Sequence, residues 1–121
     1  MNAQLRKGFL EFCVLASIVN KDSYGYQIIK DINSCISISE STLYPILKRL
    51  ETQQDVITYS VEHNGRLRKY YKITEQGKIH LEEFLENWKQ IENIYHLSSD
   101  FPLFNVTIAD TVHNIFTYFA G

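Results

Sequence analysis

The chain has few of the residues on which several protein classes depend. Its 121 residues include two cysteines, two prolines, five glycines and one tryptophan. Cys13 and Cys35 lie far apart without a CxxC spacing, a pattern typical of reduced core residues in a cytosolic protein. No run reaches the roughly 18 uninterrupted apolar residues of a membrane-spanning helix, and the N-terminal segment lacks the apolar core of a signal peptide. We therefore expect one small cytoplasmic domain with no membrane partner.

Signatures of catalysis are missing as well. The chain has four histidines, which fall in different predicted elements: His63, His80, His96 and His113. None of them belongs to an HExxH motif or to a Cys/His ligand spacing. The chain has no GxSxG motif, P-loop or dinucleotide fingerprint. His80 and Glu83 lie one helical turn apart, which is more typical of a surface pair than of a site. The sequence predicts no enzyme, no metal site and no cofactor.

The net charge of −2 conceals an uneven distribution. Residues 1–40 contain four basic and four acidic residues, a balance of zero. Residues 41–80 contain seven basic and four acidic residues, or +3, and residues 81–121 contain one basic and six acidic residues, or −5. A basic central part and an acidic C-terminal part suit a protein that places only one face on phosphate.

The first 33 residues predict two helices. In the segment from Gln4 to Asn20, apolar residues at helical spacing form one face: Leu5, Phe9, Phe12, Cys13 and Ala16. The second helix would follow an N-cap at Ser23 or Asp22. Its buried stripe would consist of Ile28, Ile29 and Ile32. Gly25 disfavours a helix, so we expect it to permit close packing against a neighbouring helix.

A third helix follows a short polar turn, which together with the second predicts a helix-turn-helix. Its N-cap would be Ser37, with Glu40 three residues on, or Ser39. Its inner face would consist of Leu43, Ile46, Leu47 and Leu50. Pro45 lacks an N–H and clashes with the preceding turn, so we expect the helix to start late or to bend there. A hydroxyl-rich helix start with free amides suits phosphate and base contacts, whereas the alternative is a kinked structural helix.

Residues 56–73 predict a two-stranded hairpin. The segment Val56–Glu62 is rich in β-branched and aromatic residues. Asn64-Gly65 is typical of a type I′ turn, which needs positive φ at both central residues. Three cations follow the turn: Arg66, Arg68 and Lys69. Such a basic tip suits a minor groove or a phosphate backbone, and the alternative is a solvated turn. A groove-reading helix beside a basic hairpin is the layout of a winged helix-turn-helix.

Thr74 would cap a long helix from about Glu75 to Leu97. Its apolar residues recur at helical spacing, with Phe84 among them, and five of them would form a dimer interface: Leu81, Leu85, Trp88, Ile91 and Tyr95. The stripe is longer than a small winged domain can cover, so we expect the helix to pair with its counterpart in a second copy. Trp88 would lie in the core of that interface. Alternatively, Trp88 forms an aromatic wall for a small planar aromatic effector.

Several short motifs occur together along the chain. They are Tyr24-Gly25-Tyr26, Leu43-Tyr44-Pro45, Leu47 with Arg49-Leu50-Glu51, Gly65-Arg66 with Arg68-Lys69-Tyr70-Tyr71, Ile73-Thr74, Gly77 and Trp88. Through this combination, residues 5 to 95 resemble the PadR family of bacterial transcriptional regulators. Each motif alone is weak, whereas the combination is specific.

The resemblance implies a mainly α fold with a β-hairpin wing. A winged helix-turn-helix would span residues 1–74 and a dimerisation helix residues 75–97. The resemblance also implies a homodimer that binds double-stranded DNA, usually as a repressor on a palindromic operator. By analogy, the residues at the DNA would be Ser39, Ser41, Thr42, Tyr44 and Lys48 on the third helix, and Arg66, Arg68 and Lys69 in the wing. The rival hypothesis is a dimeric winged module that docks on another protein without binding DNA.

Two segments depart from the family's pattern. The family usually has a glycine in the turn after the third helix, where this chain has Gln53-Gln54-Asp55-Val56. We expect Gln54 or Asp55 to take any positive φ there. Residues 98–121 have no recognised counterpart, although apolar residues from Val112 to Phe119 share one helical face. This tail is predicted to be a short docking helix, or a surface for an effector or partner.

Overall fold

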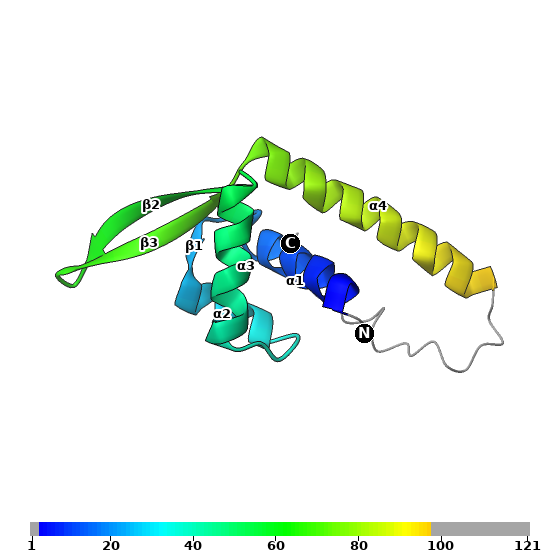
Figure 1. The fold of residues 1–121 in the computed structure, drawn as a ribbon, viewed down its shortest axis with the longest axis horizontal. Helices are drawn as coiled ribbons and strands as arrows, with labels where there is room; N and C mark the ends of the chain where they lie inside the picture. The colour runs from blue at the N-terminus through cyan, green and yellow to red at the C-terminus, as the bar shows by residue number, and fades with distance from the viewer. Residues whose placement is uncertain (1–2, 98–121) are drawn as a thin grey trace.

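The structure, a computed structural model, describes residues 3–97. The predicted docking helix in the tail lies outside these residues. The elements are α1 (Ala3–Ile18), β1 (Ser23–Tyr24), α2 (Gly25–Asn33), α3 (Glu40–Thr52), β2 (Val56–His63), β3 (Arg66–Ile73) and α4 (Glu75–Leu97). Helices α1 to α3 pack together, the β2–β3 hairpin projects to one side, and α4 extends to the other (Figure 1). The predicted mainly α fold with a hairpin wing is confirmed.

Helix α1 lies at the centre of the core. It contacts α2, α3, α4 and β3, so it is covered from several directions. Its buried residues therefore form more than the single face that the spacing predicted, and they run on through Leu10, Phe12, Cys13, Val14, Leu15, Ala16, Ser17 and Ile18. Leu5 was predicted on the buried face but is 60% exposed near the helix start.

The start of α2 differs from the prediction. Ser23 and Tyr24 form the short strand β1, which pairs antiparallel with Tyr71 and Tyr70 of β3. Tyr24 is the N-cap of α2, in an extended conformation and without a capping side-chain hydrogen bond. The predicted cap at Ser23 or Asp22 is wrong, because the sheet takes up Ser23 as part of a third strand. Two residues are too few for a strand to show in an alternation pattern.

Helix α3 begins earlier than its proline suggested. Ser39 is the N-cap, and its Oγ accepts a hydrogen bond of 3.3 Å from the Thr42 amide. The helix starts at Glu40, so of the two expected effects of Pro45 the late start is wrong, and Ser39, one of the two expected caps, is confirmed. Burial of Leu43 and Leu47 holds the turns on either side of the proline in place. Because Pro45 has no N–H, it cannot donate the usual helical hydrogen bond to the carbonyl four residues earlier.

The three-stranded antiparallel sheet has the order β1-β3-β2. The hairpin pairs Val56 with Ile73 at its base and His63 with Arg66 at its tip. Asn64 and Gly65 have φ values of 53° and 79°, so the predicted turn with two positive φ angles is confirmed. In the turn after α3, Gln54 has a φ of 66° and takes the left-handed conformation that a glycine would otherwise supply.

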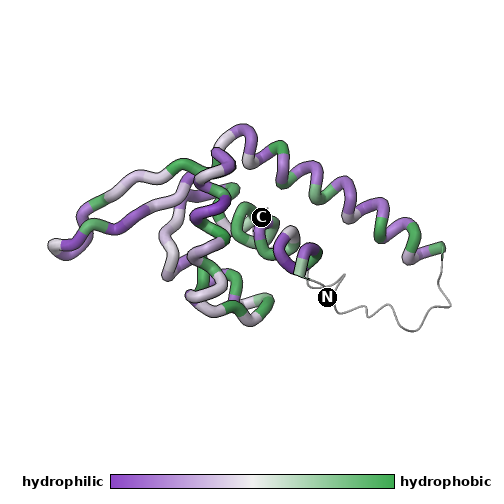
Figure 2. Tube along the Cα trace, in the orientation of Figure 1, coloured by the Kyte–Doolittle hydropathy of each residue, from purple (hydrophilic) through white to green (hydrophobic). Residues whose placement is uncertain are grey.

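Helix α4 spans the predicted range. Thr74 Oγ1 accepts a hydrogen bond of 3.0 Å from the Gly77 amide, which confirms the predicted cap. Phe84 stacks on Phe12 of α1 with ring centroids 4.4 Å apart. Apolar positions recur along α4 as far as its end, beyond the part that lies near the core (Figure 2). Among residues 3–97, no helix is long and apolar enough to cross a membrane.

Candidate nucleic-acid interface

Three hydroxyl groups gather at the start of α3. Ser39 Oγ lies 3.0 Å from Ser41 Oγ and 3.1 Å from Thr42 Oγ1. Ser39 and Ser41 are exposed, and Thr42 is half-buried. Glu40 is the acidic residue of this first turn, where it complements the helix dipole but repels phosphate. This end of α3 therefore suits hydrogen bonds to base edges better than a strong grip on phosphate.

Tyr44 continues the exposed side of α3. Its side chain lies over Gly25 of α2, where a Cβ atom would come within 2.6 Å of the Tyr44 hydroxyl. The predicted close packing at Gly25 is confirmed, and it holds a tyrosine that remains 47% exposed. Lys48 follows one turn later and is also exposed. Ser41, Tyr44 and Lys48 thus share a side of α3 that faces away from the buried leucines.

The wing does not present its three cations on one face. Side chains alternate along a strand, so Arg66 and Arg68 of β3 lie on one face and Lys69 on the other. The Arg68 guanidinium lies 4.0 Å from the centroid of the Tyr24 ring, a cation–π contact. Lys69 Nζ lies 3.4 Å from Glu51 Oε1 near the end of α3. Arg66 is exposed directly beside the turn.

Glu51 ties the wing to α3. One carboxylate oxygen pairs with Lys69 of β3, and the other accepts a hydrogen bond of 2.8 Å from Thr58 Oγ1 of β2. Both strands are therefore linked to the last turns of the helix on the face that carries the buried Tyr71. These contacts fix the direction in which the hairpin projects.

Aromatic residues that the sequence analysis missed organise the opposite face of the wing. Tyr59 and Tyr70 stack with centroids 5.5 Å apart at 9°, and Tyr24 meets Tyr70 edge-on at 5.5 Å. The Tyr59 hydroxyl donates a hydrogen bond of 2.6 Å to Asp22 Oδ2, which raises the pKa of Tyr59 above its ordinary value. This cluster joins the wing to β1 and supports Arg68. The hairpin register implied by Asn64-Gly65 could have placed Tyr59 opposite Tyr70.

The predicted interface stripe of α4 divides into two parts. Leu81 is 7% exposed in the core of its own chain, and Leu85 and Trp88 pack partly against that core. Ile91 is 44% exposed, and Tyr95 is half-buried beside His96. Exposed apolar surface continues at Ile94 and Leu97, which are 61% and 86% exposed. Trp88 Nε1 is buried without a hydrogen-bond partner among the described residues.

Within residues 3–97, no group of three or more His, Cys, Asp and Glu side chains could hold a metal ion. His80 pairs with Asp55, whose Oδ1 lies 2.7 Å from His80 Nδ1, and not with Glu83 as the helical spacing suggested.

Comparison with known families accounts for this arrangement. The Transcriptional regulator PadR-like family matches residues 14–83. The chain belongs to the PadR family. Two relatives are the uncharacterized protein X of Lysinibacillus sphaericus, 34% identical over 102 residues, and the transcriptional regulator YqjI of Escherichia coli (strain K12), 35% identical over 89 residues. The first alignment covers 80% of this chain and 94% of its relative, and the second covers 70% and 42%.

Several solved structures share the fold. A PadR-like transcription factor from Bacteroides fragilis has a TM-score of 0.71 at 34% identity, covering 79% of this chain and 96% of that one. Smu.1704 from Streptococcus mutans UA159 has a TM-score of 0.65 at 42% identity, with coverage of 78% and 85%. Bacillus subtilis PadR, solved in complex with operator DNA, has a TM-score of 0.59 at 23% identity, covering 64% and 46%, and so shares the fold alone. This PadR-family chain is a transcriptional regulator and not an enzyme.

Proposed function

We propose that this PadR-family protein is a cytoplasmic homodimer that binds double-stranded DNA sequence-specifically and represses transcription from a palindromic operator. The observation that carries the proposal is the exposed side of α3, with its hydroxyl cluster, Tyr44 and Lys48, next to a basic hairpin. The operator complex of the distant relative from Bacillus subtilis supports the same use of the fold.

In this proposal α3 enters the major groove. Ser41, Thr42 and Tyr44 would meet base edges, since hydroxyl groups both donate and accept hydrogen bonds. Ser39 would keep the helix start in place as its N-cap, and Lys48 would meet phosphate. In the wing, Arg66 and Arg68 would reach the minor groove or the flanking backbone. Lys69 would contribute less, because Glu51 already neutralises part of its charge.

The second half of α4 supports dimerisation. The helix has 23 residues and is about 34 Å long. Leu81 packs in its own chain, whereas Ile91 and Leu97 expose apolar surface along the far half. A second copy of the same helix is the partner that a symmetric regulator would provide. The two winged helix-turn-helix domains of the dimer would meet half-sites about one duplex turn apart.

An effector site at Trp88 is part of the proposal. The indole N–H of Trp88 is a donor that the described part of the chain leaves without an acceptor. A buried donor without a partner is costly, and a second copy or a small molecule would be able to supply the acceptor. A planar aromatic effector with a polar substituent could stack on the ring and accept this hydrogen bond.

Equilibrium DNA binding distinguishes the proposal from its rival. The probe would be a duplex from the region upstream of the protein's own gene, and the control would be a random duplex of equal length. We expect affinity to fall steeply between about 50 and 200 mM salt, because phosphate contacts release counterions. A module that docks only on proteins would show neither a preferred duplex nor this salt dependence.

A further inference from the structure

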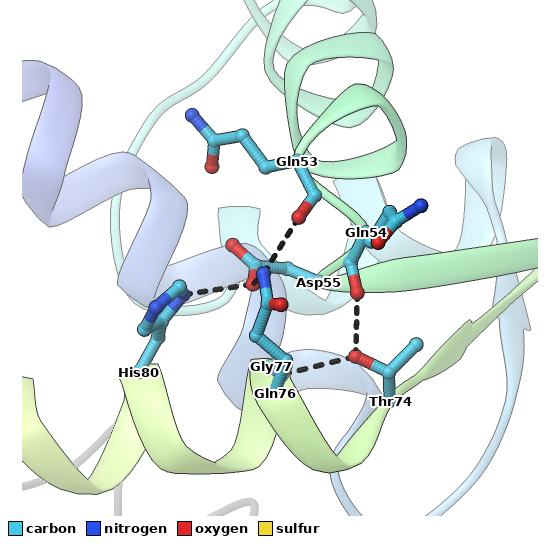
Figure 3. A network of polar contacts seen from close by, with 7 residues as sticks. All are labelled: Gln53, Gln54, Asp55, Thr74, Gln76, Gly77 and His80. Atoms are coloured by element: carbon cyan, nitrogen blue, oxygen red, sulfur yellow. Dashed lines mark hydrogen bonds and ion pairs between the residues drawn. The ribbon is translucent and has the colours of Figure 1, made fainter.

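A compact polar junction joins α4 to the rest of the chain. We call residues 3–73 the reading head, since they comprise the helix-turn-helix and the wing. The junction links its turn Gln53–Asp55 to the first turns of α4, as Figure 3 shows. The Thr74 amide donates to the Asp55 carbonyl at 3.0 Å, and Thr74 Oγ1 donates to the Gln54 carbonyl at 2.7 Å. These bonds therefore hold the chain where β3 of the wing passes into α4, which we call the arm.

The carboxylate of Asp55 is the centre of this junction. Asp55 is 2% exposed; its Oδ1 accepts a hydrogen bond from Gln76 Nε2 at 3.0 Å and lies 2.7 Å from His80 Nδ1, an ion-pair contact. Gln76 Nε2 also donates to the Gln53 carbonyl at 2.6 Å. Both side chains that contact the carboxylate come from α4, so this compensation of the buried carboxylate depends on the orientation of α4. Burying a charge adds little stability even when it is paired, whereas it can fix a geometry.

Gly77 lets the backbone of α4 approach the turn closely and so limits how α4 can tilt there. A Cβ atom there would lie 2.2 Å from the carbonyl oxygen of Asp55 and 2.8 Å from Cγ1 of Ile73. The backbone of α4 thus rests directly on the backbone of the turn, without an intervening side chain. Gln76 makes two hydrogen bonds, which are directional, and His80 adds its ion pair, so these contacts and Gly77 together define an angle as well as a position.

Helix α4 also makes apolar contacts with the reading head. Leu81 is buried and Phe84 stacks on Phe12, which are contacts that tolerate small rotations. An arm of about 34 Å that turns by about 10° at its base moves its far end by about 6 Å. One base pair corresponds to about 3.4 Å along a duplex. A displacement of about 6 Å at the end of the arm would therefore change the half-site spacing that a dimer fits.

We propose that Asp55, Gln76 and His80 are positioning residues that set the angle between the reading head and α4, and with it the operator half-site spacing. The inference rests on the proposed dimeric DNA binding. The variant that tests it is Gln76→Ala with His80→Ala. Its matched control is Glu75→Ala, which breaks the Lys78–Glu75 ion pair in the same part of the helix without touching the turn at Gln53–Asp55.

The first readout is binding to operators whose half-sites are separated by the natural spacing or by one additional base pair. We expect the wild type and Glu75→Ala to lose at least about tenfold in affinity on the insertion, and the double variant to lose less than about threefold. Affinity for a single half-site should agree within about twofold among all three proteins. A double variant that keeps the wild-type ratio would overturn the inference, even if it unfolds at a lower temperature.

The second readout needs neither DNA nor a dimer. Two spin labels, one at Glu62→Cys in the wing and one at Gln90→Cys in α4, report the distance between wing and arm. Cys35→Ser removes the half-buried native thiol. The full-length labelled protein is diluted with unlabelled protein. We expect a narrow distance distribution in the wild type and a broad one in the double variant. His80→Ala alone, in which Gln76 still reaches Asp55, should broaden it less. Equal widths in all variants would contradict the inference, whereas a wild type that binds no DNA would contradict only the proposed function.

Discussion

The three cations of the wing have different surroundings, although the sequence shows them as one basic cluster. Arg66 is exposed at the turn, whereas Lys69 shares its charge with Glu51 at 3.4 Å. Arg66→Ala should therefore flatten the slope of log affinity against log salt by about one unit, and Lys69→Ala by less than about half a unit. Salt titrations of both variants on one duplex measure this. A larger change for Lys69→Ala would place the opposite face of the wing on the DNA.

Thr42 offers a test of base reading. Its hydroxyl belongs to the cluster around Ser39, and the nearby Glu40 disfavours a pure phosphate contact. Thr42→Ala should cost about 1–3 kcal/mol on the operator and much less on random DNA. Thr42→Ser keeps the hydroxyl and is the control, which should stay close to the wild type. Equal losses on both duplexes would assign Thr42 to phosphate positioning.

The two thiols should differ in reactivity. Burial, with a smaller effect from nearby Cys35, raises the pKa of Cys13 to about 12, so Cys13 has almost no thiolate at pH 8. Cys35 is only half-buried. Since the thiolate is the reactive form, Ellman's reagent should modify one thiol in the folded protein and two after unfolding. Rapid modification of both thiols in the folded protein would contradict the central place of α1.

At the scale of elements, two glycines mark close approaches with different consequences. Gly77→Ala would force a Cβ against the backbone of Asp55, so we expect it to lower the free energy of unfolding by about 2–3 kcal/mol. Gly25→Ala meets only the mobile end of Tyr44, so it should cost less stability but weaken operator binding by displacing that side chain. Urea unfolding and operator titration measure the two effects.

Gly8→Ala is the control for both substitutions. A Cβ at Gly8 meets nothing within 4 Å, and alanine favours a helix by about 1 kcal/mol over glycine. It should leave DNA binding unchanged and raise stability slightly. Similar gains in stability for all three alanine variants would mean that helix propensity, and not close packing, governs these positions.

The elements that could be predicted from the sequence are those with strong local signals. The Asn64-Gly65 turn, the Thr74 cap and the range of α4 each depend on neighbouring residues only, and all three are confirmed. Strand β1 could not be predicted, because its two residues are extended only through pairing with β3. The same limit applies to the buried residues of α1, since the number of elements that cover a helix is a tertiary property.

The candidate site was predicted in composition but not in arrangement. The hydroxyl residues of α3 and the wing cations are visible in the sequence, whereas the division of those cations between two faces depends on strand register. The pairing of Asp55 with His80 joins residues 25 positions apart in two elements, and no local pattern indicates it. Helical spacing pointed to Glu83 instead, which shows that a pattern confined to one helix cannot exclude a partner from elsewhere.

For the whole molecule, the arm should control assembly without controlling the fold of the reading head. Ile91 is 44% exposed on the far half of α4. Ile91→Lys should place a charge in the dimer interface, so sedimentation should show a monomer and operator binding should be lost. The thermal unfolding of the reading head should change little. Gln90→Lys adds the same charge at the preceding position, which is also exposed, and should leave the dimer intact. A dimeric Ile91→Lys protein would contradict the proposed interface.

Trp88 allows the proposed effector site to be tested separately from the proposed dimer. Trp88→Ala removes a half-buried ring that packs against the core, so it should lower stability by about 2–4 kcal/mol. Trp88→Phe keeps most of that packing but removes the indole N–H. If a planar aromatic effector accepts a hydrogen bond there, Trp88→Phe should remain a dimer and bind the operator with a much weaker response to such compounds. An unchanged response would exclude the indole N–H from effector binding.

The central claim is that two reading heads recognise one palindromic DNA sequence. Its most direct test is a fluorescence anisotropy titration of the protein on the duplex from upstream of its own gene against a random duplex, at several salt concentrations. The account predicts that the first duplex binds at least about a thousandfold more tightly, with two chains per duplex and a steep loss of affinity on both duplexes as salt rises. Equal and salt-independent affinity for both duplexes would contradict it and favour a winged module that docks on other proteins.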